Sequence, residues 1–370
     1  MTEAAEGVSR NQALEVVLRI LRGAVAAQAS DVHLKAQLQP RVRIHGQLCP
    51  LDHPALSEET VQTAVGALAS LARVTSDRLA GKQVDFSCHV PDVGRFRVHA
   101  YRQNSTVAAA LRHIPSTIPD FATLRLPPVV KRIASAERGL VLVTGATGNG
   151  KSTTIAAMLQ FINQKFPRHV VTIEDPVEWM FADSVASFSQ REVGRDVDTF
   201  QQGLEGVLRE DPDVLFVGEI RTQTEFDIAL NAAESGRLVI STFHSSDVER
   251  AISRMVNFYP GEYRDAVRHR IADVVSGVIS QRLIPKNQAT EKILATEVLT
   301  RSPTVIECVR EPTRSRGLAA ALEAGSNEYG SHSFDQTLQS MVKDKLISMD
   351  TAKANARSAN DFMRGMKLMR

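Results

Sequence analysis

The 370-residue sequence predicts an α/β protein in which a smaller α+β domain precedes the main α/β core and a helical region follows it. In the middle of the chain, short apolar runs alternate with helical stretches, which is typical of a parallel sheet covered by helices. Before this region, period-two alternation predicts strands with one buried face, and after about residue 300 helical spacing alone remains.

The N-terminal part of the chain combines helical and strand patterns. Apolar residues recur at helical spacing over 11–29, and a second helix is expected over 57–79, with a serine as its N-cap and two glutamates in its first turn. Residues 40–45 and 94–101 alternate with period two and predict strands. We therefore expect a small α+β domain over residues 1–112.

A proline-marked stretch separates this domain from the core. Prolines disfavour helix before them and remove a backbone donor, so residues 113–130 are expected to form a linker. The α/β core is expected over 131–298 and a helical region over 299–370, with a helical pattern at 333–348. Four apolar runs predict buried parallel strands in the core: 140–143, 170–173, 214–217 and 238–241. Three helices are expected between them: 153–165, 199–209 and 222–234.

Composition narrows the class of protein. With 43% hydrophobic and 23% charged residues, the chain can bury large cores. Its net charge of +2 is small for this length, so no general attraction to nucleic acid or membrane is expected. The cysteines Cys49, Cys88 and Cys308 form no C-x-x-C pair, which suits a reducing cytoplasm and excludes a four-cysteine zinc module. No run of about 18 apolar residues occurs and the acidic start is no signal peptide, so a cytoplasmic protein is expected.

The string GATGNGKST, at 145–153, fits the pattern G-x-x-x-x-G-K-[ST] of a loop that wraps nucleotide phosphates. It follows a predicted strand and opens a predicted helix, which is the context that this loop requires. The glycines let backbone N–H groups approach phosphate oxygens, Lys151 would neutralise the β- and γ-phosphates, and the Ser152 hydroxyl would coordinate Mg²⁺. The candidate nucleotide-binding residues are Gly145, Thr147, Gly148, Asn149, Gly150, Lys151, Ser152 and Thr153.

Polar side chains follow the other predicted strands, at the edge of the sheet where ligands bind. TIEDPVEW places Glu174, Asp175 and Glu178 after the second strand, where a carboxylate could hold Mg²⁺ or activate water, or could simply be solvated. Glu219 follows VLFVG in a Walker B pattern, as a glutamate after glycine in place of the usual aspartate. The fourth strand leads to His244, either a structural histidine or one that contacts the γ-phosphate.

Together these motifs resemble the type IV pilus retraction ATPases, the PilT family of secretion-type ring ATPases. TIEDPVEW resembles the family's Asp box, and the stretch from QREVG to VGEIR resembles the lead into its Walker B motif. SGRLVISTFHSSDVERAISRMVNFYP resembles its His box, and VISQRLIP the element that closes the core. ASDVHLK and GRFRVHAY resemble the small domain that precedes the core.

The resemblance implies a RecA-like P-loop core with a small PAS-like N-terminal domain, which hydrolyses ATP with Mg²⁺. It implies that Glu178 activates the hydrolytic water, that Glu219 and Ser152 hold the Mg²⁺ ion, partly through water, and that His244 senses the γ-phosphate. It also implies that basic residues of the N-terminal domain reach the nucleotide: Arg95, Arg97 and Arg112. Period-two alternation independently places Arg95 and Arg97 on one face of their strand.

The resemblance further implies a homo-hexamer that powers pilus retraction or disassembly in twitching motility. Such a motor would lie at the inner face of the cytoplasmic membrane without inserting into it. Its partner would be the pilus platform protein of the inner membrane, with no direct binding of nucleic acid.

Two departures from the family leave related motors open. PTVIECVR, at 303–310, stands where retraction ATPases commonly carry an AIRNLI-like motif, and Gly236-Arg237 replaces a Gly-His pair. An ATPase of a conjugative, type IV or type II secretion system is therefore the alternative. A DNA-translocating ATPase needs basic loops interleaved with aromatics, which a chain with 5% aromatic residues lacks. A scaffold that hydrolyses nothing is disfavoured, because Lys151, Glu178 and Glu219 are all intact.

Overall fold

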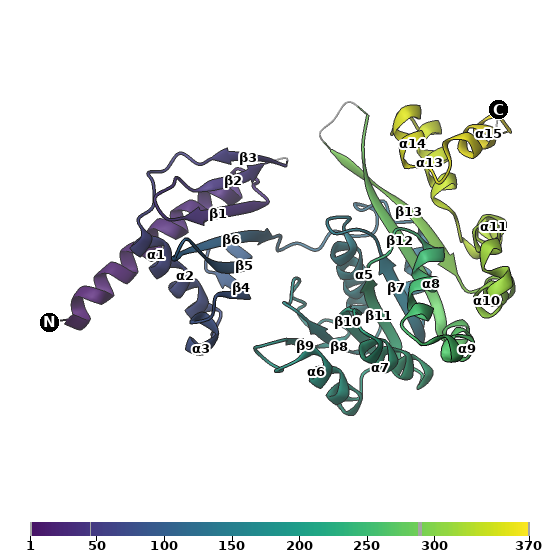
Figure 1. Ribbon diagram of the computed structural model, residues 1–370, viewed down its shortest axis with the longest axis horizontal. Coiled ribbons are helices and arrows are strands. Elements are labelled where there is room, and N and C mark those ends of the chain that lie inside the picture. Colours follow the sequence, from purple (N-terminus) through teal and green to yellow (C-terminus); the bar gives the residue numbers. More distant parts are fainter. Residues whose placement is uncertain (1, 45, 288–290, 369–370) are drawn as a thin grey trace. The chain divides into compact units, whose positions relative to one another are not determined.

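The computed structural model describes residues 2–44, 46–287 and 291–368, and it confirms the mixed α/β fold (Figure 1). The chain divides into two compact units. The first holds the chain up to Thr117 together with Pro176–Met180 and Gly194–Asp196. The second holds Ile118–Asp175, Phe181–Val193 and the chain from Val197 onward.

A six-stranded antiparallel sheet forms the first unit, in the order β3-β2-β1-β6-β5-β4. Its strands are β1 (Asp31–Lys35), β2 (Arg41–Ile44), β3 (Gln47–Pro50), β4 (Gln83–Val90), β5 (Gly94–Gln103) and β6 (Thr106–Ile114). Two helices, α1 (Thr2–Ala26) and α2 (Glu58–Leu71), share one hydrophobic core with alternate residues of these strands. Because strand residues alternate between faces, the helices cover one face of the sheet.

The single helix predicted over 57–79 is wrong. It consists of α2 and a short α3 (Ser76–Leu79), separated at Arg73, which has a left-handed φ of +56°. The first helix ends earlier than predicted for the same reason, since Gln28 has a φ of +54°. Neither break contains glycine, the residue that usually marks a left-handed position in a sequence. The strand predicted over 40–45 is β2, and His45 lies outside the described residues.

The second unit contains a seven-stranded sheet in the order β13-β12-β7-β11-β10-β8-β9. Its strands are β7 (Gly139–Thr144), β8 (His169–Glu174), β9 (Ser187–Glu192), β10 (Val214–Glu219), β11 (Leu238–Phe243), β12 (Val275–Pro285) and β13 (Lys292–Thr300). All neighbours pair in parallel except β13, which is antiparallel to β12. Four of these strands, β7, β8, β10 and β11, match the predicted apolar runs, whereas β9, β12 and β13 had not been assigned as strands.

Helices bury both faces of this sheet. On β7, Leu140 and Leu142 enter one hydrophobic core, while Val141 and Val143 enter the other. The side of Val141 holds α4 (Pro128–Ala134) and α5 (Lys151–Lys165), and α4 begins inside the stretch that was expected to be a linker. The side of Leu140 holds α6 (Phe200–Val207), α7 (Gln223–Glu234), α8 (Val248–Asn257), α9 (Arg264–Val274), α10 (Pro303–Arg310) and α11 (Leu318–Ala324). Burial on both sides explains why these strands are continuously apolar.

The C-terminal helices form a fourth core with the β12–β13 pair, which Figure 1 shows extending beside them. They are α13 (Phe334–Lys343), α14 (Met349–Asn355) and α15 (Ala359–Leu368), and the short α12 (Ser326–Tyr329) precedes them. Phe334 and Leu338 of α13 pack here with Ile284 of β12 and Ile293 of β13. The helical pattern predicted over 333–348 is α13 only as far as Lys343, because Lys345 has a left-handed φ of +57°.

Candidate active site

The phosphate loop joins β7 to the start of α5 at Lys151. Gly145, Gly148 and Gly150 have φ values of +146°, +81° and +79°, which residues with a side chain rarely adopt. Lys151 Nζ donates to the carbonyl oxygens of Gly145 (2.9 Å) and Ala146 (3.2 Å), so its ammonium group lies against the loop. A positively charged loop at a helix N-terminus is suited to bind phosphate.

Strand β12 anchors the phosphate loop through Asn149. Its Nδ2 donates to the carbonyl oxygen of Gln281 (3.2 Å), and its Oδ1 accepts from the backbone N–H of Leu283 (3.3 Å). The carboxamide thus bonds to β12 as the backbone of a neighbouring strand would. Because the side chain of Asn149 is used in this way, any contact of this residue with a nucleotide would come from its backbone.

Gln281 is a residue that the sequence analysis missed. Its side chain is fully buried, and Nε2 donates to Thr154 Oγ1 on α5 (2.6 Å). Beside it, the hydroxyls of Ser280 and Thr144 lie 2.8 Å apart and link β12 to β7. The strand VISQRLIP therefore supports both ends of the phosphate loop.

Gly145 gives a direct test of this support. A Cβ atom at Gly145 would lie 2.6 Å from the carbonyl oxygen of Gln281, so Gly145→Ala must displace the loop from β12. Backbone strain of this kind costs about 1–3 kcal/mol, so we expect the KM for ATP to rise about tenfold or more. Gly236→Ala is the matched control, because Gly236 also has a positive φ (+96°) but no atom within 4 Å of the added carbon. Equal KM values for the two variants would contradict the proposed support.

The Walker B strand, β10, contains a bulge that explains its unusual sequence. The register with β11 shifts between Val217 and Glu219, so Gly218 is the extra residue. A Cβ at Gly218 would lie 3.2 Å from the carbonyl oxygen of Ile173, which favours glycine. Thr242 Oγ1 donates to the Gly218 carbonyl oxygen (2.6 Å). Because Gly218 is an extra residue in the strand, the acidic residue stands one position later, at 219.

Glu219 and His244 meet at the carboxyl edge of the sheet. Glu219 Oε1 lies 2.8 Å from His244 Nε2, and its Oε2 accepts from Arg221 Nη2 at 2.8 Å. The Glu219 side chain is 21% exposed, so it remains accessible. The phosphate loop follows β7, which also pairs with β11, so loop and carboxylate share this edge of a parallel sheet. Arg221 was not among the predicted site residues, although it follows Glu219 by two positions.

The carboxylates after β8 differ in their surroundings. Glu174 is only 7% exposed, and its Oε1 accepts from Thr172 Oγ1 (2.7 Å) and Gln190 Nε2 (3.5 Å). Glu178 belongs to the first unit, where its Oε1 lies 3.6 Å from Arg97 Nη1. Glu174 is therefore a buried hydrogen-bond acceptor, whereas Glu178 is a partly exposed carboxylate beside a guanidinium group.

Arg95 and Arg97 lie on the face of β5 opposite the hydrophobic core of the first unit. On β5, Phe96 and Val98 are fully buried, as the period-two pattern predicted for the residues that alternate with Arg95 and Arg97. Arg95 Nη2 donates to Ser87 Oγ (2.6 Å) and to the Val177 carbonyl oxygen (2.7 Å). Arg95 and Arg97 thus both contact the Asp-box segment Pro176–Met180.

The third predicted arginine, Arg112, lies on β6 directly opposite Arg97. Its Nε donates to Asp31 Oδ1 (2.9 Å), and its side chain is 63% exposed. The structure therefore brings two of the three arginines to the Asp box and pairs the third with a carboxylate of β1.

Ser152 and Glu219 offer the oxygen ligands that Mg²⁺ prefers. Mg²⁺ is usually bound by one or two protein oxygens, with phosphate and water completing its shell. A hydroxyl on the first turn of α5 and a carboxylate at the same edge of the sheet fit this requirement. Within the described part of the chain, no group of three or more His, Cys, Asp or Glu residues could hold a metal ion by itself.

The parallel sheet, the phosphate loop and the acidic strand end define a P-loop ATPase. A family model described as type II/IV secretion system protein matches residues 8–328, and the chain belongs to this family, among its PilT-like members. The resemblance found in the sequence is thereby confirmed. No helix among the described residues is both long and apolar enough to cross a membrane.

Relatives match the chain over most of its length. The type IV pilus retraction ATPase PilT of Pseudomonas aeruginosa is 37% identical over 334 residues, which cover 90% of this chain and 96% of the relative. A twitching motility protein of Neisseria gonorrhoeae is 34% identical over 348 residues, which cover 94% of this chain and 92% of the relative.

Solved structures of related ATPases have the same fold as this chain. The crystal structure of the pilus retraction motor PilT with bound ADP superposes with a TM-score of 0.86 at 38% identity, covering 94% of this chain and 99% of that one. The ATPase DotB of Legionella pneumophila gives a TM-score of 0.76 at 25% identity, covering 92% of this chain and 95% of that one.

Proposed function

We propose that the chain is the ATP-hydrolysing motor of type IV pilus retraction and works as a homo-hexamer. The observation that carries this proposal is the 0.86 TM-score to the retraction motor PilT over nearly the whole length of both chains. The complete phosphate loop and the Glu219–His244 pair supply the chemistry that such a motor needs.

In this proposal the nucleotide is held at the carboxyl edge of the seven-stranded sheet. Backbone N–H groups of the loop and Lys151 bind the phosphates, and Ser152 and Glu219 hold the Mg²⁺ ion. The ion would neutralise the charge that develops on the phosphate oxygens. Glu178 would accept a proton from the attacking water, and His244 would respond to the γ-phosphate through its bond to Glu219.

Arg97 is proposed to act in a neighbouring subunit, as a guanidinium that stabilises charge on the departing phosphate. Arg97→Ala should fold and bind ATP but hydrolyse it poorly. Mixed with Lys151→Ala, it should regain activity, because some interfaces then pair an intact loop with an intact arginine. The ATPase rate of mixtures should therefore peak at an intermediate ratio.

The alternative is that Arg97 acts only on the Glu178 of its own chain, which it contacts at 3.6 Å. In that case every subunit of a mixed ring lacks either the lysine or the arginine at its own site. Mixtures would then show only the summed activity of the two parents at each ratio, and the cross-subunit role would be rejected.

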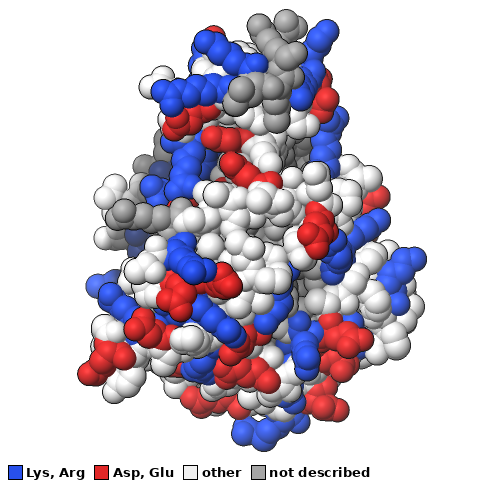
Figure 2. Space-filling view, turned by 90° about the vertical axis from the view of Figure 1, so that its right-hand side faces the viewer, with Lys and Arg blue, Asp and Glu red and all other residues white. Residues whose placement is uncertain are grey.

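The cellular partner is proposed to be the pilus platform protein of the inner membrane, with the motor lying against the cytoplasmic face of that membrane. Basic and acidic side chains are interspersed on the face shown in Figure 2, so the surface seen there forms no continuous basic patch for nucleic acid. Deleting the gene should leave cells with pili but without twitching motility. Normal twitching in the deletion strain would reject the proposal.

A second candidate is an ATPase of a conjugative, type IV or type II secretion system, favoured by the description of the matching family and by the altered 303–310 stretch, which forms α10. The same deletion strain separates the two candidates. Loss of conjugation or secretion with intact twitching would favour the secretion role.

A further inference from the structure

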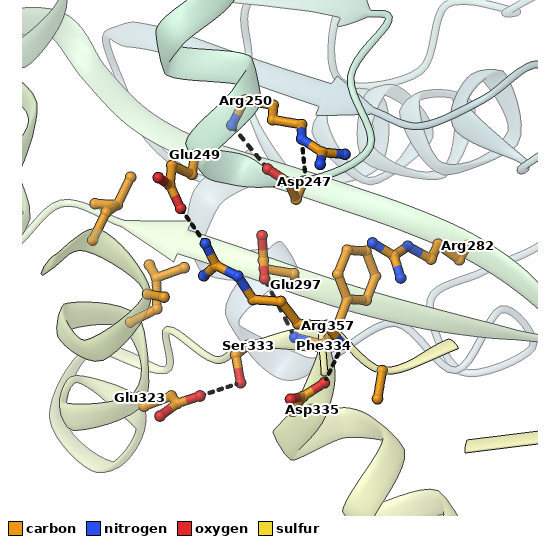
Figure 3. Close-up of a pocket in the computed structure, with 14 residues that line it drawn as sticks. Asp247, Glu249, Arg250, Arg282, Glu297, Glu323, Ser333, Phe334, Asp335 and Arg357 are labelled. Atoms are coloured by element: carbon orange, nitrogen blue, oxygen red, sulfur yellow. Dashed lines mark hydrogen bonds and ion pairs between the residues drawn. The ribbon is translucent and has the colours of Figure 1, made fainter. Parts of the chain in front are cut away.

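A cavity of about 440 Å³ in the second unit lies between α8, the β12–β13 pair, α11, the start of α13 and the turn after α14. Most of its wall is made by charged side chains, and Figure 3 shows several of them converging from different elements. Arg282 comes from β12, Glu297 from β13 and Arg357 from the turn after α14.

Glu297 joins the N-termini of two helices. Its Oε1 accepts from the backbone N–H of Val248 (2.7 Å), the first residue of α8, and its Oε2 from that of Phe334 (3.4 Å), the first residue of α13. The N-cap side chains of these helices, Asp247 and Ser333, accept from N–H groups further along. Glu297 therefore takes, from each helix, one first-turn donor that the cap does not reach.

The carboxylate of Glu297 is costly to bury. Burial and the nearby Asp247 raise its pKa above the usual range, whereas its two backbone donors and Arg282 oppose this shift. A buried carboxylate of this kind depends on keeping its hydrogen bonds.

Arg282 links the segment before α8 to α14 and to α13. Its Nη1 donates to the carbonyl oxygen of Asn355 at the end of α14 (2.7 Å), and its Nη2 to that of Ser246 (3.2 Å). Its guanidinium lies 4.0 Å from the centre of the Phe334 ring. Nearby, Arg357 Nη2 lies 2.5 Å from Glu249 Oε2 on α8. The chain is thus held at 246 by β12, at 248 by β13 and at 249 by the turn after α14.

These contacts fix the C-terminal end of the short segment that carries His244. The segment runs from the end of β11 at Phe243 to the start of α8 at Val248. Arg254 of α8 donates to the carbonyl oxygen of His244 itself, which ties the histidine to the same helix. The orientation of His244 toward Glu219 therefore depends on where α8 begins.

We propose that Glu297 and Arg282 are positioning residues for His244, which fix the 244–248 segment against the C-terminal helices. This inference rests on the proposed role of His244 in hydrolysis. Through the bonds of these two residues to Phe334 and Asn355, it gives the C-terminal helices an indirect part in ATP turnover.

Glu297→Gln tests the inference with little change of volume. Glutamine offers one acceptor oxygen, so one helix N–H would face an NH₂ group in place of a carboxylate oxygen. Since misplacement of a group at the site is costly, we expect kcat for ATP hydrolysis to fall about tenfold, with the KM for ATP changed less than about twofold. Glu323→Gln is the matched control, because Glu323 lines the same cavity but its carboxylate accepts from Ser333 Oγ. Its kcat should stay within about twofold of wild type.

A double-mutant cycle separates positioning from a general structural effect. If Glu297 acts through His244, then His244→Ala with Glu297→Gln should hydrolyse as slowly as His244→Ala alone. If the double variant is slower than His244→Ala by the full factor that Glu297→Gln loses on its own, the inference is overturned and the proposed function of His244 still stands. The same conclusion follows if Glu297→Gln has a wild-type kcat while His244→Ala is slow. A wild-type kcat for His244→Ala would reject the role of His244 and the inference with it. If Glu297→Gln does not fold, Arg282→Lys enters the same cycle with the same criteria.

Discussion

Lys151→Ala is expected to abolish both ATP binding and hydrolysis. The lysine is the basic side chain of the phosphate loop, and its ammonium group already lies against the loop carbonyl oxygens of Gly145 and Ala146. Without it, the charge of the β- and γ-phosphates is opposed only by backbone N–H groups and the helix N-terminus. Binding of a fluorescent ATP analogue and the steady-state ATPase rate would both be measured.

Lys165→Ala is the control for this substitution, because it removes the same charge from the exposed far end of α5. It should bind and hydrolyse ATP as wild type does. Substantial turnover by purified Lys151→Ala would mean that 145–153 is not the phosphate-binding loop.

Glu178→Gln is expected to bind ATP with Mg²⁺ but to hydrolyse it at least about 100-fold more slowly, as expected when a general base is lost. Glutamine keeps the shape of the side chain but cannot accept the proton of the attacking water. Single-turnover hydrolysis, measured beside nucleotide affinity, separates this effect from a loss of binding.

Two other carboxylates provide the comparison. Glu174→Gln should retain hydrolysis, since Glu174 is buried and already accepts from Thr172 Oγ1. Glu219→Gln should instead weaken the dependence of activity on Mg²⁺. If Glu174→Gln is slow and Glu178→Gln hydrolyses at nearly the wild-type rate, the wrong carboxylate has been assigned as the base.

The central part of the fold could be predicted from the sequence because its signals are local. The strand, glycine-rich turn and helix around Lys151 are adjacent in the chain, and strands buried on both faces appear as short apolar runs. β9 escaped prediction because its residues, SFSQRE, are mostly polar and only partly buried at the edge of the sheet. The break at Arg73 escaped because an arginine adopts the left-handed conformation that usually marks glycine.

The supporting residues of the site could not be predicted, because they depend on contacts between distant parts of the chain. Asn149 and Gln281 are 132 positions apart, and only the pairing of β12 with β7 brings them together. Glu297 shows no signal in the sequence either, since its function depends on two helix N-termini that converge on one strand. The glycine before Glu219 was noticed as an irregularity, and the bulge in β10 supplies its physical reason.

The retraction of single pili tests the central claim most directly. Pili would be fluorescently labelled in cells whose only retraction ATPase is this protein, with either wild-type Glu178 or Glu178→Gln at the native locus. The account predicts that pili extend in both strains but retract only in the wild type. Retraction at the wild-type frequency in the Glu178→Gln strain would contradict it.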